Sequence, residues 1–260
     1  MLRNGYFLGK NILVTGGGSG LGQAIALGFS RLGGDVVICG RDKSKLDETS
    51  KMEYKIRGEV LDVKNIEDVR NVYDKLKKEN KLPDILVNNA AANFMCSSEK
   101  LTYNGYKSII ETNLMGTLNM VLEGMKYKGG DMVIGSITTT YAETGSKGVL
   151  PSAVSKAGIN SMIRTLGAEW GSKGVRTWGV APGAIYTDGA FSRLDPEGKA
   201  KNLLVRRNPM GRMGRRDELV DLVMFLSSEY AGWINGEIVR MDGGELNEIS
   251  GMFNEFMRRV

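Results

Sequence analysis

Residues 11–22 read NILVTGGGSGLG, and this stretch decides the fold. A short apolar and β-branched run at 11–15 is followed at once by glycines, and then by AIALGF at 24–29 with helical spacing. A strand, a glycine turn and a helix in succession form the context in which such glycines indicate a dinucleotide-binding site. A plain tight turn is the alternative interpretation.

Three glycines of this stretch have distinct expected tasks. Gly16 permits the tight turn, Gly20 lets the backbone approach a pyrophosphate, and Gly22 lets the helix pack close to the strand. The phosphate would then lie against the free N–H groups at the positive end of the helix. The loop residues predicted to bind the cofactor are Gly16, Gly17, Gly18, Ser19, Gly20 and Leu21.

The end of the next expected strand, 35–39, indicates which dinucleotide is bound. An acidic residue there would hydrogen-bond the adenosine ribose hydroxyls, whereas a cation accepts a 2′-phosphate. The strand is followed by Gly40 and Arg41, so we expect NADPH with Arg41 on the 2′-phosphate. Asp42 is the competing observation, and Arg41 as an ordinary surface charge is the alternative.

The rest of the chain continues the alternation of strands and helices. Further strands are expected at 59–63, 84–87, 175–180 and 237–241, with another apolar run ending at Ile137, and helices at 43–56, 104–127 and 152–171. This alternation predicts an α/β fold: one domain, 1–260, with a single Rossmann-like, doubly wound parallel sheet of about seven strands and helices on both faces.

Ligands bind such sheets at the carboxyl ends of the strands. Asp62, after the third expected strand, could accept a hydrogen bond from the adenine amino group or cap the helix that begins near Asn65. Asn88 and Asn89 could tie neighbouring strands together. The residues following the sixth strand, predicted to line the cofactor, are Pro182, Gly183, Ala184 and Ile185.

The chain contains no histidine, so proton transfer near neutral pH needs another group. Tyr141 follows the apolar run that ends at Ile137, and Lys156 lies in the next helical pattern. An ammonium within a few ångströms of a phenol favours the phenolate, which would make Tyr141 a usable acid or hydrogen-bond donor. A half-buried tyrosine and a solvated lysine are the alternative.

Composition excludes several classes of protein. The net charge of +5 is scattered, so no nucleic-acid partner is expected, and Cys39 and Cys96 are too few for a metal site or a disulfide framework. No run is long enough to span a bilayer, and MLRNGYFLGK at the N-terminus is too short and polar for a signal peptide. We expect the mitochondrial matrix, with a leader absent from this sequence, or a bacterial cytoplasm.

Two segments and two long helices have further expected roles. Residues 187–207 are basic and glycine-punctuated, as expected of a flap over a substrate, and 245–260 form an amphipathic tail that docks. The helical patterns at 104–127 and 152–171 carry apolar residues on more than one face, which predicts a homo-oligomer, and we expect a homotetramer.

Taken together, these motifs resemble the short-chain dehydrogenase/reductase family over nearly the whole chain. The resemblance rests on the glycine turn, Asn88-Asn89-Ala90-Ala91, Pro182-Gly183 and the closing Asp242-Gly243-Gly244. The family normally carries Tyr-x-x-x-Lys, but here Ser152 stands four residues before Lys156. Three explanations are open. The tyrosine is lost and the protein only binds a dinucleotide, or Tyr141 reaches the same space from the preceding loop. In the third, Ser152 is the donor in ordinary ketone reduction, a poor donor because its hydroxyl ionises far less readily than a phenol.

The second explanation resembles the 2,4-dienoyl-CoA reductases, in which the tyrosine precedes the lysine by this spacing and a serine takes the usual tyrosine position. The similarity is greatest to the mitochondrial type. Further matching segments are Ala92-Asn93-Phe94, Ser136-Ile137-Thr138-Thr139, the Phe-Ser-Arg-Leu-Asp-Pro run at 191–196 and Trp233-Ile234-Asn235-Gly236. A short connection at 79–83 departs from the pattern, and Met257-Arg258-Arg259-Val260 is not a peroxisomal address.

The resemblance implies NADPH-dependent reduction of a 2,4-dienoyl-CoA thioester to a 3-enoyl-CoA in β-oxidation of unsaturated fatty acids. Tyr141 and Asn93 would stabilise the thioester oxyanion, and Lys156 would hold the nicotinamide ribose and favour ionisation of Tyr141. Tyr141, or a water near Ser152, would protonate the α-carbon. A 3-ketoacyl or other carbonyl reductase, and a non-catalytic NADPH-binding scaffold, are the alternative functions.

The resemblance also implies a path for the acyl-CoA. Phe94 and Thr102 would line the acyl or pantetheine portion, and Arg193 and Lys64 would meet the CoA phosphates, although Lys64 is as readily an ordinary surface lysine. Asn113 stands at the position of the wider family's helix asparagine, where it would brace backbone and water.

Overall fold

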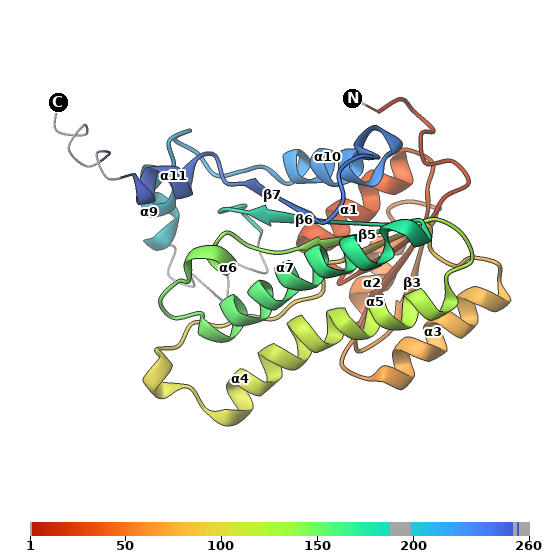
Figure 1. The fold of residues 1–260 in the computed structure, drawn as a ribbon, viewed down its shortest axis with the longest axis horizontal. Coiled ribbons are helices and arrows are strands. Elements are labelled where there is room, and N and C mark those ends of the chain that lie inside the picture. The colour runs from red at the N-terminus through yellow and green to blue at the C-terminus, as the bar shows by residue number, and fades with distance from the viewer. Residues whose placement is uncertain (1, 188–198, 252–253, 255–260) are drawn as a thin grey trace.

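The fold is built on one sheet of seven parallel strands (Figure 1). The computed structural model describes residues 2–187, 199–251 and 254. The strands are β1 (Asn11–Thr15), β2 (Asp35–Gly40), β3 (Ile56–Val60), β4 (Ile85–Asn88), β5 (Met132–Ile137), β6 (Val175–Pro182) and β7 (Glu237–Met241). They are arranged in the order β3-β2-β1-β4-β5-β6-β7. This order reverses between β1 and β4, which confirms the doubly wound prediction and places a ligand crevice at their carboxyl ends.

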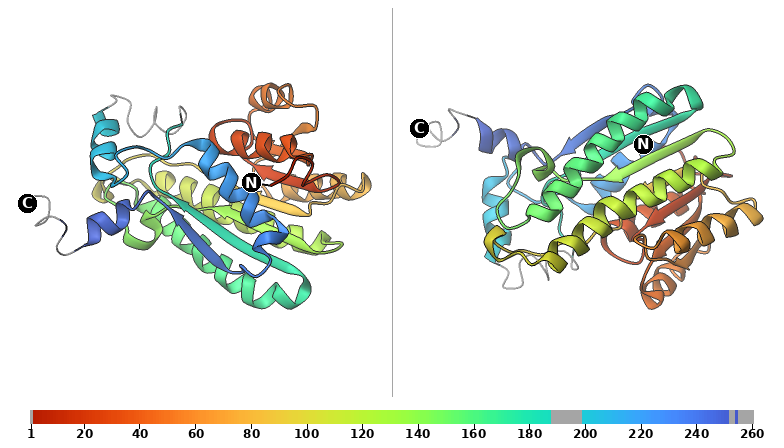
Figure 2. Two further views of the ribbon diagram at one scale, coloured as in Figure 1. Left: turned by 90° about the horizontal axis from the view of Figure 1, so that it is seen from above. Right: turned by 60° about the horizontal axis from the view of Figure 1, so that its bottom comes forward.

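Helices cover both faces of the sheet (Figure 2). The helices are α1 (Gly20–Arg31), α2 (Lys43–Ser50), α3 (Ile66–Lys78), α4 (Tyr103–Ile110), α5 (Gly116–Tyr127), α6 (Tyr141–Thr144), α7 (Leu150–Trp170), α9 (Lys199–Arg207), α10 (Arg216–Ser227) and α11 (Glu245–Ser250), with a π-helical turn at Glu111–Met115 and 3₁₀ turns at Ser98–Lys100, Gly171–Lys173 and Glu229–Ala231. One face packs on α1 and α10, and the other packs on α3, α5 and α7.

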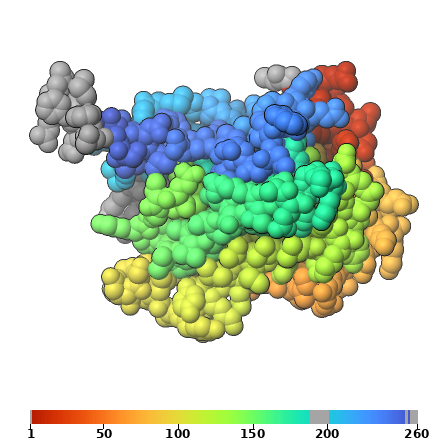
Figure 3. Space-filling view, in the orientation of Figure 1, coloured from red at the N-terminus to blue at the C-terminus, as the bar shows by residue number. Residues whose placement is uncertain are grey.

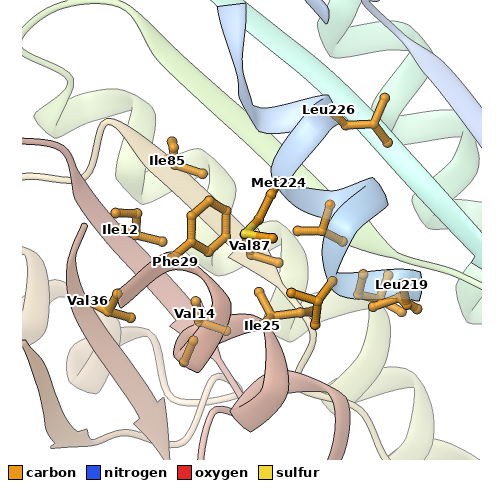
Figure 4. Close-up of a cluster of buried hydrophobic side chains, with 14 of the residues drawn as sticks. Ile12, Val14, Ile25, Phe29, Val36, Ile85, Val87, Leu219, Met224 and Leu226 are labelled. Atoms are coloured by element: carbon orange, nitrogen blue, oxygen red, sulfur yellow. The ribbon is translucent and has the colours of Figure 1, made fainter. Parts of the chain in front are cut away.

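Successive residues of β1 point into opposite cores, as the two-residue period of a strand requires. Ile12 and Val14 join the core under α1 and α10, whereas Leu13 joins the core on the other face. Figure 4 shows Phe29 of α1 lying between Ile12 and Met224 of α10. Full burial of such a side chain contributes about 1.5–3 kcal/mol, so the sheet is held from both sides.

Two predicted boundaries were wrong around β3. The helix expected at 43–56 ends at Ser50, and the third strand is Ile56–Val60 rather than 59–63. The strand starts early because Ile56 pairs with Val36 of β2, and Gly58 leaves room for Leu46, whose Cβ lies 2.8 Å from where a Gly58 Cβ would stand. Packing between α2 and β3 therefore overrides the local pattern.

The long helix expected at 104–127 is divided. A π-helical turn, Glu111–Met115, separates α4 from α5. Such turns inside helices often occur at functional sites, and this one carries the fully buried Asn113. The strand expected at 175–180 also continues to Pro182, so Pro182 belongs to β6 and does not interrupt it.

The carboxyl ends of the strands meet elements from distant parts of the chain. Figure 3 shows α6, α9 and α11 together at one end of the molecule. Asp242, directly after β7, accepts hydrogen bonds from the backbone N–H groups of Gly244 at 2.9 Å and Leu246 at 3.0 Å. These bonds fix the turn that leads from the sheet into α11.

Candidate active site

A cavity of about 1000 Å³ opens at the carboxyl edge of the sheet. Its lining comes from the glycine turn, the ends of several strands, the segment before α4, and α6, α7, α9 and α11. A volume of this size is at the upper end for small-molecule sites, and a dinucleotide with a second molecule beside it needs such a volume. The cavity is therefore the candidate active site.

The glycine turn is shaped to admit phosphate. Gly16 and Gly20 have φ values of +69° and +59°, which disfavour any residue with a Cβ. A Cβ on Gly22 would collide with the carbonyl oxygen of Gly16 and with the amide of Asn89. The cradle thus needs glycine at these three positions, and it fits the pyrophosphate of a dinucleotide.

Asn89 and Thr15 hold this turn against β4. The Asn89 side-chain amide donates to the carbonyls of Thr15 at 3.1 Å and Gly16 at 3.3 Å. The Thr15 hydroxyl accepts from the backbone N–H groups of Asn89 and Ala90, both at 3.0 Å. Asn88 donates to the carbonyl of Gly135 at 3.2 Å. The expected tie between neighbouring strands is confirmed.

Most of the predicted cofactor residues line the cavity. Those that do are Gly16, Ser19, Gly20, Leu21, Arg41, Asp62, Lys156, Pro182, Gly183, Ala184 and Ile185. Gly17 and Gly18 are not part of the lining. A Cβ on Gly17 would strike Ile38, and one on Gly18 would lie 3.0 Å from Lys45 Cβ, so these two glycines allow the turn to pack on β2 and α2.

The two charged residues after β2, Arg41 and Asp42, make different contacts. Arg41 is exposed and lines the cavity. Asp42 instead caps α2, where its carboxylate accepts from the Lys45 N–H at 3.3 Å and lies 3.6 Å from Lys45 Nζ. The competing acidic residue is therefore engaged in helix capping, and Arg41 faces the space where an adenosine would lie.

Asp62 also lines the cavity. One interpretation of the sequence was that Asp62 caps α3. That interpretation is wrong, because Asn65 is the cap and accepts from the Glu67 N–H at 3.0 Å. Asp62 accepts from the Lys64 N–H at 3.1 Å, and Lys64 Nζ lies 3.7 Å from its other oxygen.

Tyr141 is the first residue of the short helix α6, immediately after β5 and three threonines. Its hydroxyl receives a hydrogen bond from Asn93 Nδ2 at 3.3 Å and lies 3.1 Å from Ser152 Oγ. A loop was expected to supply this phenol. A single helical turn presents it instead, which fixes its direction into the cavity.

Ser152 and Lys156 lie one turn apart on α7, and both are buried and line the cavity. Lys156 Nζ donates to the carbonyl of Ile137 at 2.6 Å, and burial lowers the pKa of its ammonium to about 8. The solvated lysine of the alternative interpretation is therefore wrong. Lys156 keeps two further N–H donors for a ligand in the cavity.

Asn93 is held in place through its neighbours. The side chain of Asn113, which is fully buried, accepts from the Ala92 N–H at 2.7 Å and donates to the Ala92 carbonyl at 2.9 Å. Asn93 Oδ1 accepts from the Phe94 N–H at 2.9 Å. Its amide nitrogen is thereby aimed at Tyr141, and Asn113 braces backbone as expected.

Fewer of the predicted substrate-binding residues than of the predicted cofactor-binding residues line the cavity. Phe94, Thr102 and Lys64 lie outside the cavity lining, and Thr102 caps α4 by accepting from the Gly105 N–H at 3.2 Å. Arg193 and most of the expected flap, 188–198, lie outside the described residues, as do 252–253 and 255–260 of the tail. Within the described part of the tail, residues of α11 line the cavity.

Sequence reasoning missed several residues of the lining. These are Met95, Ser146 and Lys147, together with residues not named singly within the expected flap, Leu204 and Arg207, and within the expected tail, Glu245, Leu246 and Ile249. Leu246 and Ile249 lie three positions apart, as on one face of a helix, and this spacing could have indicated that both line the same cavity. Within the part of the chain that the structure describes, no helix is long and apolar enough to cross a membrane, and no cluster of acidic or cysteine side chains could hold a metal ion.

Comparison with known proteins assigns this site to a family. A family model described as enoyl-(acyl carrier protein) reductase matches residues 16–245. A probable 2,4-dienoyl-CoA reductase of Caenorhabditis elegans, named as producing a (3E)-enoyl-CoA, is 41% identical over 94% of this chain and 83% of its own. A Bacillus subtilis protein, named as a probable (2E)-enoyl-CoA-producing 2,4-dienoyl-CoA reductase, is 38% identical over 91% and 96% of the two chains.

A solved structure agrees with these sequence matches. The crystal structure of a short chain dehydrogenase from Bacillus anthracis superimposes with a TM-score of 0.84 at 36% identity, and covers 91% of this chain and 96% of its own. The match to the family model begins at Gly16, the first glycine of the glycine turn. This chain belongs to the short-chain dehydrogenase/reductase family, whose members use a nicotinamide cofactor.

Proposed function

We propose that this protein is a 2,4-dienoyl-CoA reductase, which uses NADPH to form a 3-enoyl-CoA. One observation carries the proposal: the Tyr141 hydroxyl lies beside Asn93 and Ser152 in the cavity that Lys156 also lines. A phenol delivered from α6, with serine on α7, is the arrangement that the resemblance implied. The names of relatives at 38–41% identity support the same assignment.

The conjugated substrate determines what the protein must stabilise. When bound, the cofactor supplies a hydride to the δ-carbon, and electron density moves through the diene onto the thioester oxygen. Tyr141 and Asn93 are the donors for that oxyanion, and each donor is worth about 3–4 kcal/mol of barrier. Because α6 and the Asn113 clamp position both groups beforehand, little reorganisation is needed as the charge develops.

Ser152 orients the phenol of Tyr141. A tyrosine hydroxyl carries one proton and accepts from two directions. Asn93 donates to the phenol oxygen, and either hydroxyl can donate in the Tyr141–Ser152 pair. When Ser152 donates, the proton of Tyr141 is free to point into the cavity. The same two donors stabilise the phenolate that remains if Tyr141 gives its proton to the α-carbon.

Lys156 supplies a positive charge to this site. Its ammonium is anchored by the Ile137 carbonyl, and with a pKa of about 8 it is largely charged at neutral pH. A buried positive charge near the reacting groups favours the anionic phenol and the anionic thioester. Its remaining donors are placed to hold the ribose hydroxyls of the nicotinamide.

The finer features follow from separate observations. NADPH is proposed because Arg41 lines the cavity while Asp42 caps α2. A homotetramer is proposed because exposed apolar residues, such as Leu122 and Val154, remain on α5 and α7. The free thiols of Cys39 and Cys96 support a reducing compartment, either the mitochondrial matrix or a bacterial cytoplasm. Roles for Lys64, Phe94, Thr102 and Arg193 stay predictions.

The product distinguishes two forms of the reaction. Protonation at the α-carbon gives a 3-enoyl thioester, whereas protonation at the γ-carbon gives a 2-enoyl thioester. If Asn93 and Tyr141 both bind the thioester oxygen, the proton of Tyr141 is nearer to the α-carbon than to the γ-carbon, which favours the 3-enoyl product. Proton NMR of the product from 2,4-hexadienoyl-CoA in deuterated water identifies the position of the incorporated deuteron.

The test follows NADPH absorbance with 2,4-hexadienoyl-CoA. The wild type is expected to turn over, and Tyr141→Phe and Asn93→Ala are each expected to lower kcat at least about 10²-fold, as loss of an oxyanion donor does. Tyr54→Phe, on a tyrosine that is 89% exposed, is the matched control. Reduction of a 3-ketoacyl-CoA that survives Tyr141→Phe would indicate a carbonyl reductase. Cofactor binding without any turnover would indicate a scaffold.

A further inference from the structure

The connection between α6 and α7, residues 145–149, forms part of the rim of the cavity. Every residue of this connection except Gly148 lines the cavity, and the side chain of Lys147 is exposed there. Gly145 and Gly148 have φ values of +71° and +81°, which disfavour any residue with a Cβ. These two glycines therefore turn the chain on either side of a lysine that faces the cavity.

This connection is joined to the segment that carries Asn93. The N–H of Cys96 donates to the Gly148 carbonyl at 2.9 Å. Asn93 lies three residues before Cys96, and Tyr141 lies six residues before Lys147. The two segments that bear the proposed donors to the thioester oxygen thus continue to the same part of the rim. Lys147 stands on the substrate side of the cavity, on an element separate from the glycine turn.

Lys147 is a cation of the cavity to which the cofactor and the reacting groups assign no role. Among the described residues, four basic side chains line the cavity. Arg41 is the residue proposed for the 2′-phosphate, Lys156 is anchored by a carbonyl, and Arg207 acts on the pKa of Glu245. No described acidic side chain forms an ion pair with Lys147. Its ammonium is therefore available to an anionic ligand.

The backbone beside Lys147 adds hydrogen-bond donors. The N–H groups of Ser146, Lys147 and Gly148 donate to no acceptor in the described part of the chain. Phosphate oxygens accept from backbone N–H groups and from lysine together, as in other loops that bind phosphate. A phosphate at this rim would supply partners for donors that the protein leaves unpaired.

We propose that Lys147 and the backbone of residues 145–148 bind the phosphate that is attached to the pantetheine arm of the thioester. The inference rests on the proposed function. This phosphate is common to CoA and to the phosphopantetheine group of an acyl carrier protein. Lys64, the lysine first predicted to meet it, lies outside the cavity lining, and its Nζ is 3.7 Å from the carboxylate of Asp62.

Three thioesters separate recognition of this phosphate from recognition of the rest of the substrate. They are 2,4-hexadienoyl-CoA, 2,4-hexadienoyl-4′-phosphopantetheine and 2,4-hexadienoyl-pantetheine, which has no phosphate. The experiment measures kcat and KM for each with NADPH at low ionic strength in the wild type, Lys147→Ala and Lys147→Arg. Lys173→Ala is the matched control, because Lys173 is an exposed lysine outside the lining, beyond the other end of the 21-residue helix α7 and about 30 Å away.

Lys147→Ala is expected to raise KM for both phosphorylated thioesters at least about fivefold, as loss of a charge-assisted hydrogen bond does at a partly solvated rim. kcat is expected to stay unchanged, because a contact remote from the reacting carbons binds the ground state and the transition state equally. The effect should shrink with added salt. KM for the pantetheine thioester is expected to stay constant, and Lys147→Arg and Lys173→Ala should keep the wild-type values.

Three results would overturn the inference and leave the proposed function intact. The first is a KM for hexadienoyl-CoA that is equal in Lys147→Ala and the wild type. The second is an equal rise with the pantetheine thioester, which would indicate a general change in the site. The third is a rise with CoA alone, which would place Lys147 on the nucleotide phosphates. Absence of wild-type turnover with all three thioesters overturns both.

Discussion

Ser152 Oγ lies 3.1 Å from the Tyr141 hydroxyl, although the two residues are 11 positions apart and belong to different helices. In the family's usual pattern the tyrosine stands where Ser152 does, four residues before the lysine. Here the phenol enters from α6, and the serine fills the vacated position on α7 and meets it. The site thus keeps a phenol beside position 152, one helical turn before Lys156, while changing the element that supplies it.

Ser152→Ala is expected to lower kcat with 2,4-hexadienoyl-CoA about tenfold or more, because the phenolate loses one of its two donors. Ser155→Ala is the control: Ser155 is equally buried on α7, but its hydroxyl donates to the Pro151 carbonyl at 2.7 Å. A loss of kcat that is equal in the two variants would contradict an orienting role for Ser152.

Lys156 links stability to pH. Its pKa is lowered to about 8 by burial and returns to about 10.5 on unfolding, so between these values the unfolded chain binds one more proton and the folded state gains stability as pH rises. Relative to Lys156→Met, the wild type is expected to gain roughly 1.4 kcal/mol per pH unit in this window.

The measurement is urea denaturation of the cofactor-free protein from pH 7.5 to 10. The comparison with Lys156→Met is essential because burial also raises the pKa of the Cys39 thiol, which works in the opposite direction above about pH 8.5. A difference between the two proteins that stays flat with pH would show that Lys156 is not deprotonated in the fold.

Arg41→Ala is expected to lower kcat/KM for NADPH at least tenfold and to leave NADH almost unaffected, because a charge-assisted hydrogen bond to the 2′-phosphate is worth about 1.5–3 kcal/mol. Lys43→Ala, at an exposed cation outside the cavity lining, is the control for general loss of positive charge. An unchanged preference between the two cofactors in Arg41→Ala would remove the basis for proposing NADPH.

Gly22→Ala is expected to destabilise the fold by about 1–3 kcal/mol, because the new methyl group would collide with the Gly16 carbonyl and the Asn89 amide. Cofactor binding is expected to weaken with it, since both partners shape the phosphate cradle. Gly129→Ala, where nothing lies within 4 Å, should change the free energy of unfolding by less than about 0.5 kcal/mol. Equal melting temperatures for the two variants would be the contrary result.

The sequence predicted the sheet well because its strands are apolar runs punctuated by glycine and asparagine. The runs at 11–15 and 237–241 were located without error. Residues 56–60 were not, because IRGEV has only two apolar side chains and a glycine at its centre, so its alternation is weak. Pairing with β2 and contact with Leu46 make it a strand. Such tertiary effects leave little local signal.

The candidate site was predictable in part for the same reason. Motif spacing located the glycine turn, Tyr141 and Lys156, all of which line the cavity. It could not show that Gly17 and Gly18 serve packing, that Asp42 caps α2, or that α11 returns to the site through the Asn208–Asp242 bond. These depend on contacts between segments far apart in the chain.

The lining of the cavity divides along the chain. The phosphate cradle and the residues predicted to meet adenosine come from 16–62, whereas Tyr141, Ser152 and Lys156 come from 141–156. Because Lys156 and the predicted cofactor residues 182–185 lie late in the chain, only the adenosine end of the cofactor site is separated in sequence from the reacting groups. Substitutions within 16–62 can therefore change the choice of cofactor without altering the residues that face the reacting groups.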